Sequence, residues 1–273
     1  MRIAYQGEPG AFSHEAAGNF WKNVNNLSFA PQKEFAAVFD TVKSGEADFG
    51  ILPIENSITG SIHDNMDLFL RYQLVITGEY ILRIEHHLLA QKNAELSDIR
   101  IILSHPQGLL QCSSFLKTLP GVEARAVYDT AGAAKTVMEN TDNTMAAIAS
   151  RRAAAEYGLT VRCSNIENNH ANYTRFLIIS KKQVCRNPDK SSIVFSTGNN
   201  PGSLFKCLAV FSLRDINLLK IESRPIVGKP WQYLFYLDFS GTIEDTACSN
   251  ALKHLEEFTE HIKFLGSYPG FVA

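Results

Sequence analysis

Residues 34–57 read EFAAVFDTVKSGEADFGILPIENS and contain one complete helix–strand unit. Apolar side chains recur at the i, i+3, i+4 and i+7 spacing that gives a helix one buried face. These side chains are Phe35, Val38, Phe39 and Val42. Gly45 follows as a C-cap, and the apolar stretch 49–54 predicts a short strand. Strands and helices alternate in the same way through residue 180, which predicts an α/β region with mainly parallel sheets.

The composition is that of an ordinary globular protein. The chain has 273 residues, of which 45% are hydrophobic and 20% are charged. Lys and Arg number 26 and Asp and Glu 28, so the formal charge is 26 − 28 = −2. This balance argues against a nucleic-acid partner, and no apolar run reaches the roughly 18 residues of a membrane helix. A negatively charged small ligand must therefore be held by local groups.

The cysteines and the N-terminus predict a cytoplasmic location. The cysteine count is odd, and no C-x-x-C pair occurs among Cys112, Cys163, Cys185, Cys207 and Cys248. This pattern indicates neither a disulfide framework nor a zinc site. A turn signal at Gly7 comes too early for a signal peptide.

The character of the sequence changes after residue 180. Residues 181–190 are polar, charged and interrupted by Pro188, so we expect a linker. Residues 191–273 then predict the order βαββαβ, the ferredoxin-like pattern. Its first helix is expected over 201–213, with Asn200 as N-cap and Pro201 at the first helical position.

Four polar turns stand at the ends of predicted strands, over residues 6–13, 55–61, 104–111 and 129–130. Ligands of open parallel sheets bind at this edge, where helix N-termini offer free N–H groups to carboxylates. A single turn of this kind is explained equally well by a helix N-cap and by a ligand site. Several in one sheet favour a binding cleft.

Other catalytic patterns are weak or missing. Thr174 and Phe176 share one face of a predicted strand and Arg175 points the other way, but this spacing alone makes none of them catalytic. The sequence has no Walker A, G-x-G-x-x-G or G-x-S-x-G motif. His86 and His87 are adjacent on a strand and face opposite sides, which is poor for one metal ion.

Seven ordered segments resemble the prephenate dehydratase family with a C-terminal ACT regulatory domain. They are Gly7-x-x-Gly10-Ala11-Phe12-Ser13-His14, Gly50–Ser57, Ser104-His105-Pro106-Gln107, Gln111-Cys112, Asp129–Ala134, Ala147–Ser150 and Asn172–Phe176. In the C-terminal part, Glu222-Ser223-Arg224-Pro225 matches the family's ESRP motif. Gly202-Ser203-Leu204 stands where the family usually has Gly-Ala-Leu.

The resemblance implies a monofunctional protein. Its catalytic domain, residues 1–180, would have two lobes like a type II periplasmic binding protein. The lobes would cover about 1–78 with 159–180, and 79–158, and the chain would cross near Gly78 and return near Leu159. The ACT domain would follow over 191–273.

The implied reaction converts prephenate to phenylpyruvate, water and carbon dioxide in phenylalanine biosynthesis, without a cofactor or metal. By resemblance, Thr174 lies at the leaving hydroxyl. We hypothesise that closure of the cleft buries Glu55 and raises its pKa, so that Glu55 supplies the proton. The residues expected to bind substrate are Asn56, Ser57, Ser104, Gln111, Arg175 and Phe176.

The resemblance also implies feedback inhibition. ACT domains would pair into a homodimer, and the dimers into a tetramer, with L-phenylalanine held between the Gly202 turn and the ESRP segment of the partner. The expected effector residues are Asn200, Gly202, Ser203, Leu204, Glu222 and Ser223.

Three alternatives stay open. The first is that the catalytic domain acts on arogenate, the aminated substrate. The second is that it is a non-catalytic binding protein for small anions. The third is that the ACT domain is a dimerisation module with a vestigial site.

Overall fold

The computed structural model describes residues 1–140 and 142–271. Two compact units are present: Met1–Met66 with Tyr80–Phe176, and Asp67–Glu79 with the residues from Leu177 onward. In the part of the chain so described, no helix has the length and apolar character needed to cross a membrane.

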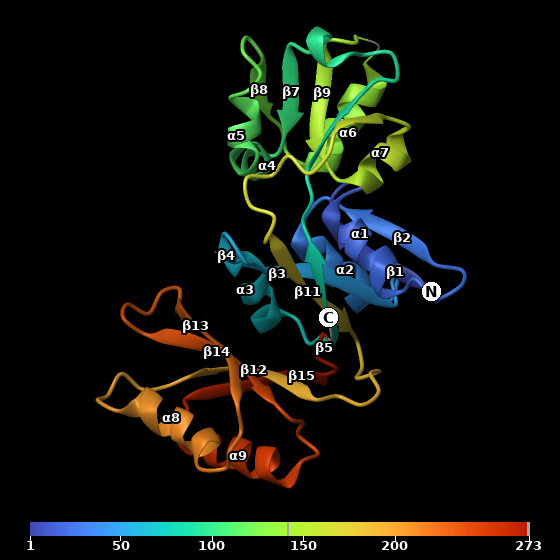
Figure 1. Cartoon of the computed structure of the whole chain (residues 1–273). Helices are drawn as coiled ribbons and strands as arrows, with labels where there is room; N and C mark the ends of the chain where they lie inside the picture. Colours follow the sequence, from blue (N-terminus) through green and yellow to red (C-terminus); the bar gives the residue numbers. More distant parts are fainter. Residues whose placement is uncertain (141, 272–273) are drawn as a thin grey trace. The chain divides into compact units, whose positions relative to one another are not determined.

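The first sheet has the strand order β2-β1-β3-β11-β5, with β4 beside β3 (Figure 1). β1 runs parallel to β2 and β3, whereas β4 is antiparallel to β3. The strands are β1 Arg2–Gln6, β2 Ser28–Gln32, β3 Phe49–Asn56, β4 Gly60–Ser61, β5 Val75–Arg83 and β11 Tyr173–Ser180. The helices between them are α1 Phe12–Phe20, α2 Phe35–Ser44 and α3 His63–Arg71.

The helix–strand unit predicted from residues 34–57 is confirmed. α2 begins one residue after Glu34, which occupies the N-cap position, and ends at Gly45 in the left-handed conformation with φ 90°. That conformation costs glycine little because it has no Cβ. On the apolar face of α2, Val38, Phe39 and Val42 are fully buried and Phe35 is partly buried. α2 packs on β1 and β3.

The second sheet has the order β10-β6-β9-β7-β8 and mixes both strand directions. β7 is parallel to β8 and β9, while β6 is antiparallel to β9 and β10. The strands are β6 His87–Ala90, β7 Ile101–Ser104, β8 Glu123–Ala126, β9 Met145–Ala149 and β10 Thr160–Cys163. The helices are η1 Leu96–Asp98, α4 Pro106–Gln111, α5 Ser113–Leu116, α6 Thr130–Glu139 and α7 Arg151–Tyr157.

The chain passes between the two sheets at other places than expected. β5 continues through Gly78, which does not break the strand. β10 pairs with β6, so the chain leaves the second sheet after Cys163 and not near Leu159. The crossing that the resemblance implied near Gly78 therefore lies beyond Arg83, where β5 ends.

A buried serine connects the first turn of the chain to the second sheet's helices. Ser150 Oγ donates a hydrogen bond to the Gly10 carbonyl at 2.7 Å and accepts one from the Ala153 N–H at 3.0 Å. Gly10 has φ 90°, and a Cβ there would lie 2.6 Å from Ala153 Cα. This contact fixes the β1–α1 turn against the N-terminus of α7.

The C-terminal βαββαβ order is confirmed: β12 Lys190–Ser196, α8 Ser203–Ser212, β13 Leu218–Pro225, β14 Tyr233–Ser240, α9 Thr246–Glu256 and β15 His261–Tyr268. The sheet order is β13-β14-β12-β15, and each strand is antiparallel to its neighbours. Phe195, Phe211 and Leu237 lie at the centre of its core.

The predicted start of α8 is wrong. The helix begins at Ser203, and its N-cap is Gly202 with φ 80°, not Asn200. A left-handed residue cannot continue a helix begun at Pro201, so the helix starts only after it.

We expect Ser150→Ala to lower the free energy of unfolding by about 1–3 kcal/mol, because it removes both a helix cap and the donor to a buried carbonyl. Urea unfolding measures the change. Ser212→Ala, at an exposed position of α8, is the control and should stay within about 0.5 kcal/mol of the unchanged protein. Equal losses in the two variants would contradict this role for Ser150.

Candidate active site

A cavity of about 370 Å³ lies within the first unit. All four polar turns singled out in the sequence contribute to its wall, as the cleft interpretation predicts. The polar lining residues are Gln6, Ser13, Asn56, Thr59, His86, His105, Gln107, Gln111, Tyr128, Asp129, Thr130 and Thr174. Phe12, Phe35, Pro53, Ile62, Ile84 and Phe176 are among its apolar residues.

The amide of Asn56 has a single possible orientation. Its Oδ1 accepts hydrogen bonds from the backbone N–H groups of Ile58 and Thr59, both at 3.0 Å. Its Nδ2 lies 3.2 Å from the carbonyl oxygen of Tyr173. Since a backbone N–H can only donate and a carbonyl can only accept, the oxygen and nitrogen of this amide cannot be exchanged.

This orientation determines what Thr174 can do. Asn56 Nδ2 donates to Thr174 Oγ1 at 3.0 Å. Among the residues that the structure describes, none accepts a hydrogen bond from the Thr174 hydroxyl. Its side chain is 7% exposed and lines the cavity. The hydroxyl hydrogen is therefore available to a bound molecule.

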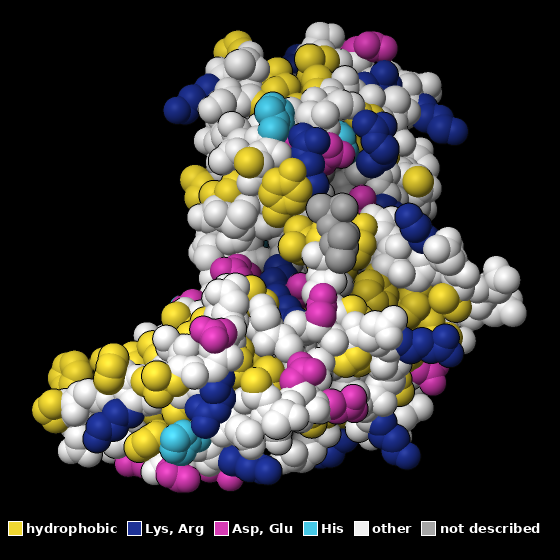
Figure 2. Space-filling view, turned by 60° about the horizontal axis from the view of Figure 1, so that its bottom comes forward, with side chains coloured by type: hydrophobic (Ala, Val, Ile, Leu, Met, Phe, Trp, Pro, Cys, Tyr) yellow, Lys and Arg dark blue, Asp and Glu magenta, His cyan; other side chains and the backbone are white. Residues whose placement is uncertain are grey.

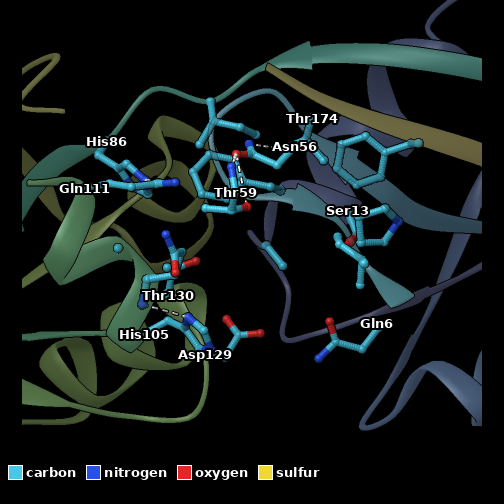
Figure 3. Close-up of a pocket in the computed structure, with 18 of the residues that line it drawn as sticks. Gln6, Ser13, Asn56, Thr59, His86, His105, Gln111, Asp129, Thr130 and Thr174 are labelled. Atoms are coloured by element: carbon cyan, nitrogen blue, oxygen red, sulfur yellow. Dashed lines mark hydrogen bonds between the residues drawn. The ribbon is translucent and has the colours of Figure 1, made fainter. Parts of the chain in front are cut away.

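The hydrogen bonds continue from Asn56 through Asn172 and Gln111 to His86. Figure 3 shows Asn56, Gln111 and His86 on the cavity wall. Asn56 Nδ2 donates to Asn172 Oδ1 at 2.7 Å, and Asn172 Nδ2 donates to Gln111 Oε1 at 3.1 Å. Gln111 Oε1 also lies 2.9 Å from His86 Nε2. Because that oxygen only accepts, Nε2 of His86 must carry the hydrogen.

His86 is a neutral imidazole in this arrangement. It is 2% exposed, and burial lowers its pKa. Its Nδ1 is buried and has no hydrogen-bond partner among the described residues. The ring presents one donor to Gln111 and keeps an unused acceptor.

Two further helices begin at the cavity wall. His105 caps α4 by accepting a hydrogen bond from Gln107 N–H at Nδ1, which places the hydrogen of its neutral ring on Nε2. Asp129 caps α6, where its Oδ1 accepts from the N–H groups of Ala131 at 2.6 Å and Gly132 at 3.1 Å. Burial raises the pKa of Asp129, and its backbone hydrogen bonds oppose that effect.

Of the predicted site residues, the cavity brings together Asn56, Gln111, Thr174 and Phe176. Glu55 and Arg175 are not among its lining residues. Each is next to a lining residue on its strand, and alternation turns the two neighbours to opposite faces. In this structure Glu55 therefore does not face the cavity that Thr174 lines.

Ser57 and Ser104 are structural residues and not part of the cavity wall. Ser57 Oγ donates to the Ala171 carbonyl and accepts from Tyr173 N–H. Ser104 is completely buried, and its Oγ donates to the Ile148 carbonyl at 2.7 Å. Their hydroxyls are used for joining strands and turns.

Sequence reasoning missed His86 as a site residue. The adjacent pair His86-His87 was weighed only as a metal site. Within the described residues, no group of His, Cys, Asp or Glu is arranged to hold a metal ion. No motif could have indicated the His86–Gln111 contact, because it joins a connection between sheets to α4.

The predicted effector residues divide into two groups. Asn200, Ser203 and Leu204 line a cavity of about 140 Å³ together with Trp231 and Tyr233. Gly202 supplies the turn at its edge. Glu222 and Ser223 lie on β13 and do not line it within one chain.

A family model described as prephenate dehydratase matches residues 3–184. The chain belongs to the prephenate dehydratase family. The alternation of strands and helices and the family match agree with the α/β fold class predicted from the sequence.

Related sequences and related solved structures are similar to this protein over almost its whole chain. Arogenate dehydratase/prephenate dehydratase 2, chloroplastic, from Arabidopsis thaliana is 45% identical over 98% of this chain and 73% of its own length. A prephenate dehydratase from Arthrobacter aurescens, solved in complex with L-Phe, has a TM-score of 0.88 and 30% identity over 98% of this chain and 90% of its own. A structure described as GqqA, a novel type of quorum quenching acylase, has a TM-score of 0.90 and 32% identity over 99% and 98%.

We expect the protein to lose stability as the pH falls from 7 to 5. Burial lowers the pKa values of His14, His86 and His87, that of His14 to about 4. In the unfolded chain a histidine has its ordinary pKa of about 6.5. The unfolded chain therefore binds more protons than the folded state below about pH 6.5, and each such histidine contributes a slope of up to about 1.4 kcal/mol per pH unit.

Urea unfolding at pH 7, 6 and 5 measures this slope. His86→Asn should make it shallower, whereas His261→Gln, at an exposed position, is the control. Nitrogen NMR should show His86 protonated at Nε2 only. A stability that rises toward pH 5 would contradict the assignment.

Proposed function

We propose that the cavity binds prephenate or arogenate and removes water and carbon dioxide from it together. Prephenate gives phenylpyruvate in this reaction, and arogenate gives phenylalanine. The hydrogen-bonded position of Thr174, whose hydroxyl is held by Asn56 with its hydrogen available to the cavity, carries the proposal. The family match and the names of the relatives support it.

The chemistry needs help at the leaving oxygen. The bond between the ring and its carboxylate breaks, carbon dioxide departs, and the released electron pair makes the ring aromatic as the C–O bond breaks. Hydroxide is a poor leaving group, so a donor placed at that oxygen stabilises the charge that develops in the transition state. Thr174 supplies this donor. The departing hydroxide becomes water by taking up one proton from an acid of the bulk solvent, so the reaction consumes one proton.

Nucleophilic attack by Thr174 is less well supported. An acylase requires a nucleophile whose proton a neighbouring base removes. Among the described residues, the side chain that hydrogen-bonds to the Thr174 hydroxyl is that of Asn56. Its amide nitrogen donates this hydrogen bond and cannot act as a base. This arrangement favours donation by Thr174.

Thr174→Ala should lower kcat by about 10²–10³, the usual effect of removing one preorganised donor from a transition state. Thr174→Ser keeps a hydroxyl and should retain most of the activity. Steady-state rates with both substrates, together with circular dichroism of each variant, measure the effect.

Normal turnover by Thr174→Ala would remove Thr174 from the mechanism. Glu55→Gln is the matched control from the neighbouring strand and should keep the acid limb of the pH–rate profile. Loss of that limb would restore Glu55 as the proton source. Tight substrate binding without turnover would indicate a small-anion-binding protein.

The C-terminal unit is proposed as an ACT domain that senses L-phenylalanine and pairs two chains. Its βαββαβ order and the cavity at the Gly202 turn support this role. Figure 2 shows hydrophobic side chains gathered on this unit, and Phe205, Val227 and Trp231 are each more than 70% exposed. A homodimer would cover such residues, and a tetramer would form from two dimers.

We propose that the effector acts on the active-site cavity through α3. Arg224 of the ESRP segment binds Asp67 on α3 with a distance of 2.7 Å between Nη2 and Oδ2. α3 begins directly after Ile62, which lines the active-site cavity. Feedback inhibition requires that L-phenylalanine bind the less active state more tightly. A cytoplasmic location is part of the same proposal, although the Arabidopsis relative is named as chloroplastic.

L-Phenylalanine should inhibit the enzyme and bind with measurable heat. Glu222→Gln should weaken binding by about 10–100-fold, the loss expected when a charged hydrogen bond to the amino group is removed. Lys253→Gln, at an exposed position of α9, is the control. Titration calorimetry with sedimentation of the same samples measures affinity and assembly. Absence of both heat and inhibition would leave the unit as a dimerisation module only.

A further inference from the structure

The charge of the active-site cavity is unusual for a site that takes a dicarboxylate. Its described lining residues include one carboxylate, Asp129, and neither lysine nor arginine. His86 is neutral for the reasons given above. A substrate with two carboxylates and no positive group would therefore meet a negative charge without a cation to offset it.

The two proposed substrates differ in charge. Prephenate has two carboxylates and a ketone, whereas arogenate carries an ammonium group in place of the ketone. A buried carboxylate binds an ammonium group by charge-assisted hydrogen bonds and repels a dianion. The lining thus favours the aminated substrate on electrostatic grounds.

The position of Asp129 matches the geometry of the substrate. In Figure 3, Asp129 and Gln6 lie on the side of the cavity away from Thr174 and Asn56. The leaving hydroxyl is attached to the ring carbon opposite the carbon that bears the side chain. When the hydroxyl is held at Thr174, the ring carbon that bears both the side chain and the ring carboxylate lies toward Asp129. An ammonium group on that side chain can then reach Asp129, and of the groups on this carbon it is the one with the opposite charge.

The carboxylate of Asp129 is held in place by backbone groups. Ala131, Gly132 and Glu8 donate backbone hydrogen bonds to it, and the N-terminus of α6 stabilises its negative charge. A carboxylate has about four lone-pair positions, so it can still accept a hydrogen bond from an ammonium group. Its side chain is 8% exposed, which limits competition from water.

We propose that Asp129 is the residue that distinguishes the two substrates, by binding the ammonium group of arogenate and disfavouring the prephenate dianion. This inference rests on the proposed function and refines it. The cap of α6 alone does not require a negative charge, since serine or asparagine caps a helix about as well as aspartate. The cap and the charge can therefore be separated by substitution.

The test compares kcat/KM for arogenate and prephenate in the full-length enzyme. The unchanged protein should prefer arogenate by at least about 10-fold, the effect of about 1.4 kcal/mol. Asp129→Asn and Asp129→Ser keep the cap and remove the charge, and should lower the arogenate/prephenate ratio by about 10–100-fold. Most of that change should come from a loss with arogenate, with prephenate turnover unchanged or raised.

Glu139→Gln is the matched control, because it removes a carboxylate from the exposed end of the same helix. It should leave the ratio unchanged, and an equal effect would mean that overall charge and not Asp129 sets the preference. Circular dichroism and thermal unfolding establish that each variant is folded.

The outcomes separate the two proposals. If the unchanged protein turns over neither substrate, the proposed dehydratase function fails. If it is active but prefers prephenate, or if a folded Asp129 variant keeps the original ratio, the specificity inference alone is overturned. The ratio of the unchanged protein does not depend on the folding of any variant.

Discussion

The hydrogen bonds of the Asn56 amide are the constraint on which the active-site cavity depends. Two backbone N–H groups of the following turn hold its oxygen, so its nitrogen must face Thr174 and Asn172. That choice sets the direction of every later hydrogen bond through Gln111 and fixes the hydrogen on His86 Nε2. A tight backbone turn thereby aims a hydroxyl hydrogen into the cavity, and no charged group is needed to hold it there.

The cavity is polar but carries little charge, and this agrees with the small net charge of the whole chain. Its walls offer amides, several hydroxyls, imidazoles and helix N-termini, all of which can contact a carboxylate without the help of a lysine or arginine. Such groups are fixed before the substrate arrives, so little reorganisation is needed in the transition state. Among the described lining residues Asp129 is the one carboxylate, and none is a lysine or an arginine. Asp129 therefore dominates the electrostatic potential that a bound substrate meets.

Much of the architecture follows from local sequence signals. The helical spacing of residues 34–44, the C-cap at Gly45 and the C-terminal βαββαβ order all appear in the structure. The predicted crossing between the sheets and the predicted start of α8 were wrong, and both lie near glycines. Gly78 lies within β5 and does not break it, and Gly202 takes the left-handed cap conformation, which moves the start of α8 beyond Pro201. A glycine permits several backbone conformations, and long-range contacts select among them.

The sequence by itself indicated the family, the polar turns that form the cavity, and Thr174 and Asn56, which both line it. Only the tertiary structure decided which side chain of each turn faces the cavity. β3 is buried on both faces, as the full burial of the neighbours Ile51 and Leu52 shows, so no polar–apolar alternation reveals which face lines the site. For that reason the sequence alone could not exclude Glu55 from the cavity wall. The contact of His86 with Gln111 joins segments 25 residues apart, and only the folded chain brings them together.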